Sequence, residues 1–348
     1  MSQPPSPPPP PQRVLIIKPS ALGDVVTALP VLRALRRAFP QAHLAWLLAD
    51  SCAPLLAHDS ELDEVVLFER RRLGRAWRSP RALIELWRFL RRLRRGRYDW
   101  TIDLQGLARS GWFTRATRSP VRAGFADARE GAAWFYTLRV QPAREHTVDR
   151  NIELANALGL DARPQDMRLQ VAPHAQAFAE RALARSTLQP SRFIVCVPPT
   201  RWTTKLYPVR HWRRVVGQLV DRFPVVLLGT PADRELCAAV AADQPAGVLD
   251  LSGQTKVPEM VALIAASAGV VCCDSAAKFI APAVDVPCVT LIGPTRLERT
   301  GPYLNGRAVV ATIPCQGCLR RRCRHATCME SIEPSAVVRA VLETFCGK

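Results

Sequence analysis

The amino-acid sequence predicts an α/β protein made of two doubly wound halves, each built on a parallel sheet. Short β-branched runs alternate with helical patterns, which is typical of parallel strands covered by helices. The alternation starts again near residue 190, and 348 residues are enough for two domains with separate cores. Small-residue loops follow several strands, at the sheet edge where such proteins bind ligands.

The first half opens with a strand over Arg13–Ile17, and the loop Lys18–Asp24 after it is the most informative stretch of the chain. We expect a helix from about Asp24 to Phe39 that is kinked at Pro30, because proline lacks the N–H that a helix interior needs. Asp24 either caps this helix or points into a cleft and accepts a proton. The other elements expected in this half are strands over residues 42–49, 64–68 and 98–104 and a helix over 147–158.

The second half repeats the pattern with a helix from about Val209 and strands over residues 193–197, 224–228, 269–273 and 287–292. Polar side chains follow all four strands: Thr200, Arg201, Lys205, Asp233, Asp274, Ser275 and Thr295. Lys, Arg and hydroxyl groups suit a pyrophosphate, and Asp233 can accept hydrogen bonds from ribose hydroxyls. Each residue alone is better explained as a cap or turn, but their shared place at four strand ends favours a nucleotide site.

The predicted boundaries are a disordered Pro-rich tail over 1–12, Rossmann-like domains over 13–170 and 185–330, and a C-terminal helix over 331–348. The N-terminus lacks the basic start and apolar core of a signal peptide, and no apolar run is long enough to span a bilayer. We therefore expect a cytoplasmic protein. Since G-x-G-x-x-G and a P-loop lysine are both missing, dehydrogenase and P-loop functions lose their main support.

The net charge of +18 is concentrated between Arg70 and Arg97, where twelve arginines accompany one glutamate, a net of +11. Leu83, Leu86, Trp87, Leu90 and Leu93 share one helical face, which we expect to pack on the sheet. The arginines call for an acidic partner, because their mutual repulsion costs stability. A basic amphipathic helix with a Trp can lie on an anionic membrane surface, whereas no nucleic-acid recognition motif is present.

Ten of the eleven cysteines fall into two groups. Six sit in apolar contexts and are expected in the core: Cys52, Cys196, Cys237, Cys272, Cys273 and Cys288. The spacing C-x2-C-x4-C-x4-C describes the others that cluster: Cys315, Cys318, Cys323 and Cys328. These four could hold structural zinc or an iron–sulfur cluster, or form disulfides, although usual zinc sites separate two pairs by a longer loop. No D-x-D pair ends a strand, so the sequence requires no bound divalent ion.

Five short motifs occur in order along the chain from about residue 13 to the C-terminus: Lys18-x-Ser-x-x-Gly-Asp24, Ile102-Asp-Leu-Gln-Gly-Leu107, Arg122-x-Gly-Phe125, Arg201-Trp-x-x-Lys205-x-x-Pro208 and Gly293-Pro-Thr295. Their order and spacing resemble the ADP-heptose glycosyltransferases of lipopolysaccharide biosynthesis, glycosyltransferase family nine, and within it most closely heptosyltransferase I. Each motif is short and weak alone, but five in the right order are specific.

This resemblance implies a GT-B fold, in which two Rossmann-like domains face a cleft. The N-terminal domain would take a Kdo inner-core sugar on lipid A, and the C-terminal domain would bind ADP-heptose. Asp24 would act as general base, Lys205 would contact the donor phosphates, and transfer would invert the anomeric centre without a cofactor. The donor residues would be Thr200, Arg201, Asp233, Asp274, Ser275, Lys278 and Thr295, and the acceptor residues Lys18, Ser20, Gln105 and Arg122.

Such an acceptor is a lipid-linked acidic glycan, so the protein would work peripherally at the inner face of the inner membrane, and the arginine-rich segment would gain an anionic partner. One departure from the family pattern stands out. Members typically carry Asp-Ser/Thr-Gly-x-x-His where this chain has Asp274-Ser-Ala-Ala-Lys-Phe279, so Ala276 replaces the glycine and Phe279 the histidine. Lys278 could supply the missing cation.

Two further functions stay open at this point. The altered segment at Ala276–Phe279 is compatible with a non-catalytic or divergent sugar-nucleotide or glycan-binding protein on the same scaffold. The arginine-rich helix is compatible with a nucleic-acid-binding protein. Turnover of ADP-heptose distinguishes the first alternative from an enzyme, and a salt-dependent preference for duplex over anionic lipid identifies the second.

Overall fold

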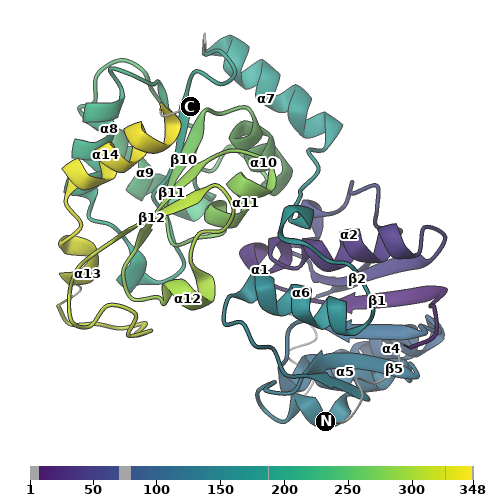
Figure 1. Ribbon diagram of the computed structural model, residues 1–348. Coiled ribbons are helices and arrows are strands. Elements are labelled where there is room, and N and C mark those ends of the chain that lie inside the picture. The colour runs from purple at the N-terminus through teal and green to yellow at the C-terminus, as the bar shows by residue number, and fades with distance from the viewer. Residues whose placement is uncertain (1–7, 70–79, 187, 326, 347–348) are drawn as a thin grey trace. The chain divides into compact units, whose positions relative to one another are not determined.

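A computed structural model describes residues 8–69, 80–186, 188–325 and 327–346, and it divides into two compact units, one up to Met167 and one from Arg168 (Figure 1). Each unit contains one six-stranded, fully parallel sheet whose strand order reverses in the middle. α-Helices connect most successive strands, as parallel strands require, and short 3-10 helices take their place after β2 and after β5. The predicted doubly wound α/β fold is therefore confirmed for both halves.

The first sheet has the order β3-β2-β1-β4-β5-β6. The second, written from its own first strand, has the same order, because β7 and β10 lie side by side at its centre. The strand order reverses between β1 and β4 in one sheet and between β7 and β10 in the other, and doubly wound proteins bind ligands beyond the carboxyl ends of such strand pairs. The strands are β1 (Arg13–Ile17), β2 (His43–Ala49), β3 (Glu64–Phe68), β4 (Trp100–Asp103), β5 (Val121–Phe125), β6 (Leu138–Val140), β7 (Ile194–Val197), β8 (Val225–Leu227), β9 (Val248–Asp250), β10 (Gly269–Cys273), β11 (Cys288–Ile292) and β12 (Gly306–Val310).

Thirteen α-helices are found in the described ranges. In the first unit they are α1 (Leu22–Val26), α2 (Leu29–Ala38), α4 (Pro80–Arg95), α5 (Ala108–Thr117) and α6 (Thr147–Ala157). In the second unit they are α7 (Pro173–Arg185), α8 (Val209–Leu219), α9 (Arg234–Ala241), α10 (Val257–Ala265), α11 (Ala277–Ala283), α12 (Leu297–Thr300), α13 (Thr327–Glu330) and α14 (Pro334–Phe345). No helix among the described residues has both the length and the apolarity needed to cross a bilayer.

The central strands form the two cores. In β1, Val14–Ile17 are fully buried, as are Ile194–Cys196 in β7 and Val270–Cys273 in β10. Strands covered on both faces are expected to be apolar throughout, which explains these continuous apolar runs. The six cysteines expected in the core are all buried, so that prediction is confirmed.

The single helix expected over residues 24–39 is wrong in its boundaries. The structure has a short α1 and a separate α2, with a break at Thr27–Ala28. The Thr27 carbonyl accepts a hydrogen bond from the Asn151 side chain at 2.9 Å, which replaces a helical partner there. Pro30 lies in the first turn of α2, where its missing N–H would have no intrahelical acceptor, so it starts a helix instead of kinking one.

The packing expected for α4 is correct in part. Leu93 is buried and Leu86 and Leu90 pack partly on the core, but Leu83 and Trp87 are more than half exposed. The buried face of α4 is centred on Phe89. Its ring lies 5.8 Å from the ring of Phe68 and 5.2 Å from the ring of Phe113. The arginines between Arg70 and Arg78 lie outside the described residues.

The structure locates part of the predicted N-terminal tail, the boundary between the units and the C-terminal segment. Residues 1–7 lie outside the described ranges, while Pro11 is buried and the Pro9 carbonyl accepts a hydrogen bond from Trp100 Nε1 at 3.1 Å. Residues 8–12 therefore contact the first unit. The boundary between the units falls after Met167, and α7 packs within the second unit against α10. The C-terminal segment forms α14.

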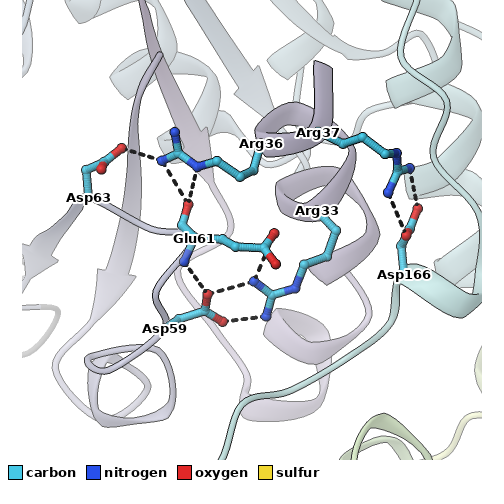
Figure 2. A network of polar contacts seen from close by, with 7 residues as sticks. All are labelled: Arg33, Arg36, Arg37, Asp59, Glu61, Asp63 and Asp166. Carbon is cyan, nitrogen blue, oxygen red and sulfur yellow. Dashed lines mark hydrogen bonds and ion pairs between the residues drawn. The ribbon is translucent and has the colours of Figure 1, made fainter. Parts of the chain in front are cut away.

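Three arginines of α2 fasten this helix to two loops of the first unit (Figure 2). Arg33 is buried and forms a two-pronged ion pair with Asp59, with N–O distances of 2.6 and 2.5 Å. Arg36 bonds Asp63 at 2.6 Å, and Arg37 bonds both oxygens of Asp166 at 3.0 and 2.8 Å. These charges are neutralised by the fold, so they do not contribute a surface for an acidic partner.

Candidate functional site

In the first unit, the loops after β1 and β4 meet where the strand order reverses. Lys18 follows β1, is 6% exposed, and donates from Nζ to the Leu104 carbonyl at 2.6 Å. The lysine therefore joins the two strand-end loops. Ser20 is half-buried in the same loop, two residues before the start of α1.

Asp24 lies in the first turn of α1 and is half-buried. One carboxylate oxygen, Oδ2, accepts the backbone N–H of Ala21 at 2.9 Å, which caps the helix start. A carboxylate has two oxygens, so capping through Oδ2 leaves Oδ1 for another donor. Asp24 therefore caps the helix, and its second carboxylate oxygen can still accept a proton as a general base does.

Asp103, which the sequence reasoning did not single out, shapes the loop after β4. Its fully buried carboxylate accepts from the Tyr136 hydroxyl at 2.6 Å and from the N–H groups of Gln105 and Gly106 at 2.9 and 3.2 Å. Burial raises the pKa of this carboxyl, and these hydrogen bonds oppose the rise. The sequence offered only an acid at a strand end with a glycine three residues later; in the structure Gly106 has a positive φ of 64°, which favours glycine.

Gln105 carries an unsatisfied acceptor at this site. Its Oε1 is buried without a hydrogen-bond partner in the described structure. An orphaned buried polar atom costs stability, so it marks a position where a ligand hydroxyl would be favourable. Arg122 is engaged elsewhere: it bonds the carbonyls of Phe135 and Ser119 at 2.9 and 2.6 Å, and it pairs in register with Thr101, two residues before the end of β4. The structure does not bring Arg122 to the strand-end loops.

In the second unit, the loops after β7, β10 and β11 converge on Asp274. Its carboxylate forms an ion pair with Lys205 Nζ at 2.8 Å and a second with Lys278, and it accepts from the Thr295 hydroxyl at 2.6 Å. The Thr200 hydroxyl donates to the backbone carbonyl of Asp274 at 3.0 Å. Five residues predicted for donor binding from sequence therefore form one connected cluster.

The two lysines of this cluster differ in exposure. Lys278 is 2% exposed and also donates to the Thr300 carbonyl, so its ammonium is committed to holding α12 and Asp274 together. The Lys205 side chain is 14% exposed, and its Nζ lies 4.2 Å from the centre of the Trp202 ring. With two ammonium groups against one carboxylate the cluster has a net positive charge, and Lys205 is the lysine that faces solvent.

Charge balance sets the protonation of Asp274. Burial would raise its pKa, but the Lys278 and Lys205 ammonium groups outweigh burial and hold the pKa below its usual value. The carboxylate is therefore ionised at neutral pH and fixes the position of Lys205. The site is suited to binding an anion at the lysine.

The remaining predicted donor residues lie around this cluster. Ser275 Oγ is buried without a partner in the described structure, a second orphaned polar atom at a strand end. Arg201 is exposed beside Trp202. Asp233 Oδ2 accepts from the Thr230 N–H at 2.8 Å and from its hydroxyl at 2.6 Å, so this carboxylate caps the turn after β8. Phe279, at the altered position, is 5% exposed.

The cysteine segment lies against the same loops. Gln316 Nε2 donates to the Thr295 carbonyl at 3.0 Å, and the Thr204 hydroxyl donates to the Arg320 carbonyl at 2.9 Å. A side chain at Gly293 would meet Met329 Sδ at 2.5 Å, so only glycine allows this close packing. Within the described residues, no three His, Cys, Asp or Glu side chains are placed to hold a metal ion. The segment contacts the loop that carries Lys205 through these hydrogen bonds.

Known proteins match this chain closely enough to identify its relatives. The family model for glycosyltransferase family 9 (heptosyltransferase) matches residues 86–329. Lipopolysaccharide heptosyltransferase 1 of Pseudomonas aeruginosa is 32% identical over 331 residues, which cover 90% of this chain and 88% of the relative. The solved structure of Escherichia coli heptosyltransferase WaaC with ADP has a TM-score of 0.77 at 26% identity, covering 95% of this chain and 99% of that one. WaaC with ADP-2-deoxy-2-fluoro heptose has a TM-score of 0.75 at 26% identity, with the same coverage.

Proposed function

The chain belongs to glycosyltransferase family 9, the heptosyltransferases, and on this premise we propose that it transfers heptose from ADP-heptose to the Kdo inner core of lipid A. It is a GT-B glycosyltransferase of lipopolysaccharide core synthesis. The observation that carries the assignment of its site is the Asp274 cluster, where a buried carboxylate positions Lys205 at the reversal of strand order in the second sheet.

The second unit binds the ADP-sugar. The Lys205 ammonium contacts the diphosphate, and Arg201 adds a second cation from the same loop. As the bond between the anomeric carbon and the diphosphate oxygen breaks, negative charge grows on ADP, and a fixed cation stabilises that charge more in the transition state than in the ground state. Ser275 Oγ has no hydrogen-bond partner in the described structure, and it forms a hydrogen bond with the ADP-sugar.

The first unit binds the acceptor, and Asp24 is the general base. The oxygen of Asp24 that does not cap the helix takes the proton of the acceptor hydroxyl. At the same time the hydroxyl oxygen of the acceptor attacks the anomeric carbon of the heptose. One C–O bond forms, the C–O bond to ADP breaks on the opposite face, and the configuration inverts. Gln105 Oε1 accepts from another acceptor hydroxyl, and Lys18 and Ser20 complete the loop that surrounds it.

Because Lys205 and Arg201 supply the positive charge, the reaction needs no divalent ion. We expect turnover to survive dialysis against a chelator. The described structure does not place Cys315, Cys318, Cys323 and Cys328 to hold a metal ion, and elemental analysis of the dialysed, active enzyme tests the zinc or iron–sulfur alternative directly. The acceptor is anchored in a bilayer, so the enzyme works as a peripheral protein at the cytoplasmic face of the inner membrane.

The direct test incubates the purified protein with ADP-heptose and Kdo-lipid A and follows both ADP release and the mass of the lipid. The proposal predicts stoichiometric ADP and a lipid heavier by one heptose. ADP-heptose binding without turnover would instead identify a non-catalytic protein, an outcome that the altered segment, with a half-buried Ala276 and a buried Phe279, makes worth testing.

Asp24→Asn tests the base while keeping the helix cap, because an amide oxygen still accepts the Ala21 N–H. We expect kcat/KM to fall by about 10²- to 10⁴-fold, the usual contribution of general base catalysis, with the melting temperature unchanged. A variant that keeps wild-type kcat/KM removes Asp24 from the mechanism. Asp24→Ala, which also removes the cap, adds a stability loss of about 1 kcal/mol and separates the two roles.

A further inference from the structure

The outward face of α4 carries three large apolar side chains at its N-terminal half. Leu83, Ile84 and Trp87 are 57%, 50% and 53% exposed, while the opposite face of the helix packs on the core through Phe89 and Leu93. Exposed apolar side chains are ordinary when scattered, but three within one helical turn form a patch. Such a patch in a helix rich in arginine indicates a surface that contacts something apolar and anionic.

The same face continues as a basic surface toward the helix end. Arg91 and Arg94 follow Trp87 at helical spacing, and the Arg91 guanidinium lies 4.4 Å from the centre of the Trp87 ring. A hollow of about 620 Å³ opens there, at the amino ends of β4 and β5. Five arginines line it: Arg91, Arg94, Arg95, Arg97 and Arg118.

The charge of this hollow is not neutralised within the described part of the chain. None of its five arginines forms an ion pair there, whereas Arg92 of the same helix pairs with Glu64 at 2.8 Å. The nearby Asp99 carboxylate accepts the backbone N–H groups of Gln12 and Arg13 at 2.7 and 2.8 Å. The hollow therefore attracts an anion with several negative groups.

We propose that the outer face of α4, formed by Leu83, Ile84, Trp87, Arg91, Arg94 and Arg95, binds an anionic phospholipid surface. The apolar side chains enter the boundary between headgroups and acyl chains, Trp87 lies at the interface, and the arginine hollow takes up lipid phosphates. This assignment rests on the proposed function, which places the acceptor in a membrane.

The direction of α4 connects this surface to the acceptor loops. The helix returns from the carboxyl end of β3 to the amino end of β4, so its apolar half lies toward the edge of the sheet that holds Gln105. A second hollow, of about 310 Å³ and mostly apolar, opens beside Leu86 and is lined by Phe68 and by Trp112 of α5. Helix α5 starts three residues after Gln105. A lipid surface on α4 is thus adjacent to the loops expected to receive a lipid-linked sugar.

The experiment measures cosedimentation of the full chain with vesicles of phosphatidylglycerol and phosphatidylcholine, and with phosphatidylcholine alone. Arg91→Gln, Arg94→Gln and Arg95→Gln are combined, since glutamine keeps helix propensity. The matched control combines Arg181→Gln, Arg185→Gln and Arg192→Gln, which removes the same charge from exposed positions of the second unit. Trp87→Ser is compared with Trp134→Ser, because Trp134 is 82% exposed outside this surface.

We expect the α4 triple variant to bind the anionic vesicles roughly 100-fold more weakly, since each basic residue near such a surface contributes about 1 kcal/mol, or roughly fivefold. The control triple variant should change binding by no more than a few-fold, and Trp87→Ser should weaken it where Trp134→Ser does not. Equal losses in both triple variants would show a net-charge effect and overturn the proposal. Tighter binding of duplex DNA or of inositol hexakisphosphate than of vesicles would overturn it as well.

Vesicle binding needs no turnover, so this result is independent of the proposed reaction. The α4 triple variant should keep wild-type turnover of ADP-heptose on a detergent-dispersed acceptor and lose it on an acceptor embedded in anionic vesicles. Loss on both acceptors, with an unchanged melting temperature, would place these arginines in the active site and contradict a docking role.

Discussion

Asp274 holds two lysines that have different tasks. Lys278 is buried against the Thr300 carbonyl, while Lys205 rests on Trp202 and faces solvent. We expect Lys205→Met to weaken ADP binding by roughly tenfold to 100-fold, the range for losing one charge-assisted contact. Calorimetry measures it, with the exposed Lys256→Met as the control of equal charge. An unchanged ADP affinity would show that Lys205 does not reach the diphosphate.

Lowering the pH should show how much the ion pairs of Asp274 stabilise the fold. The pKa of Asp274 is held low in the folded protein, so its ion pairs stabilise the fold at neutral pH and are lost as pH falls below about 4, where the unfolded carboxylate also takes up a proton. The stability difference between the wild type and Asp274→Asn should therefore shrink between pH 5 and about 3. Denaturant unfolding at each pH measures this; a difference independent of pH would contradict the assignment.

Sequence reasoning placed Lys205, Asp274 and Thr295 at strand ends because short apolar runs followed by polar residues mark those ends clearly. It assigned Lys205 to the donor phosphates by resemblance but did not show which of Lys205 and Lys278 is buried. Which of them is buried depends on how α11 packs, and a helix of seven residues gives too short a pattern to read. Asp103 was missed for a related reason, since an acid inside a motif does not reveal that Tyr136, 33 residues away, will bond it.

At the scale of elements, the arginines of α2 show that ion pairs within the fold neutralise part of the positive charge. Arg33 and Asp59 form a buried pair, and removing one member leaves an uncompensated charge. We expect Arg33→Met to lower the free energy of unfolding by about 3–5 kcal/mol, and the double variant with Asp59→Leu to recover most of that loss. The exposed pair Arg213–Asp243 supplies the control, since Arg213→Met should cost about 1 kcal/mol or less. A double variant as unstable as the single one would contradict this account.

Element boundaries could be predicted where a residue pattern is decisive, and β3 at Glu64–Phe68 is confirmed without a shift. The strands β6, β8 and β9 have only three residues each. Since β6 and β9 also lie at sheet edges and are not fully buried, neither shows an apolar pattern in the sequence. The exposed Leu83 and Trp87 could not be foreseen, because helical periodicity defines an apolar face but not which side of it meets the sheet.

For the whole molecule, each unit completes its own sheet and core. The residues of the Asp274 cluster, from Thr200 to Thr295, all belong to the unit that begins at Arg168. We expect a fragment of residues 168–348 to fold and to bind ADP within about tenfold of the full chain, but not to transfer heptose. Circular dichroism melting and calorimetry check this. A folded fragment without ADP affinity would show that the first unit contributes to nucleotide binding.

The shared strand order of the two sheets has a consequence for engineering. Among the described residues no strand pairs with a strand of the other half, and the strand order of both sheets reverses at the same place. A relative's half can therefore be joined at Met167 without disturbing either hydrogen-bonded ladder. Chimeras recombined at that junction would inherit the nucleotide-sugar choice of one parent and the glycan choice of the other. Specificity in this scaffold can then be altered one lobe at a time.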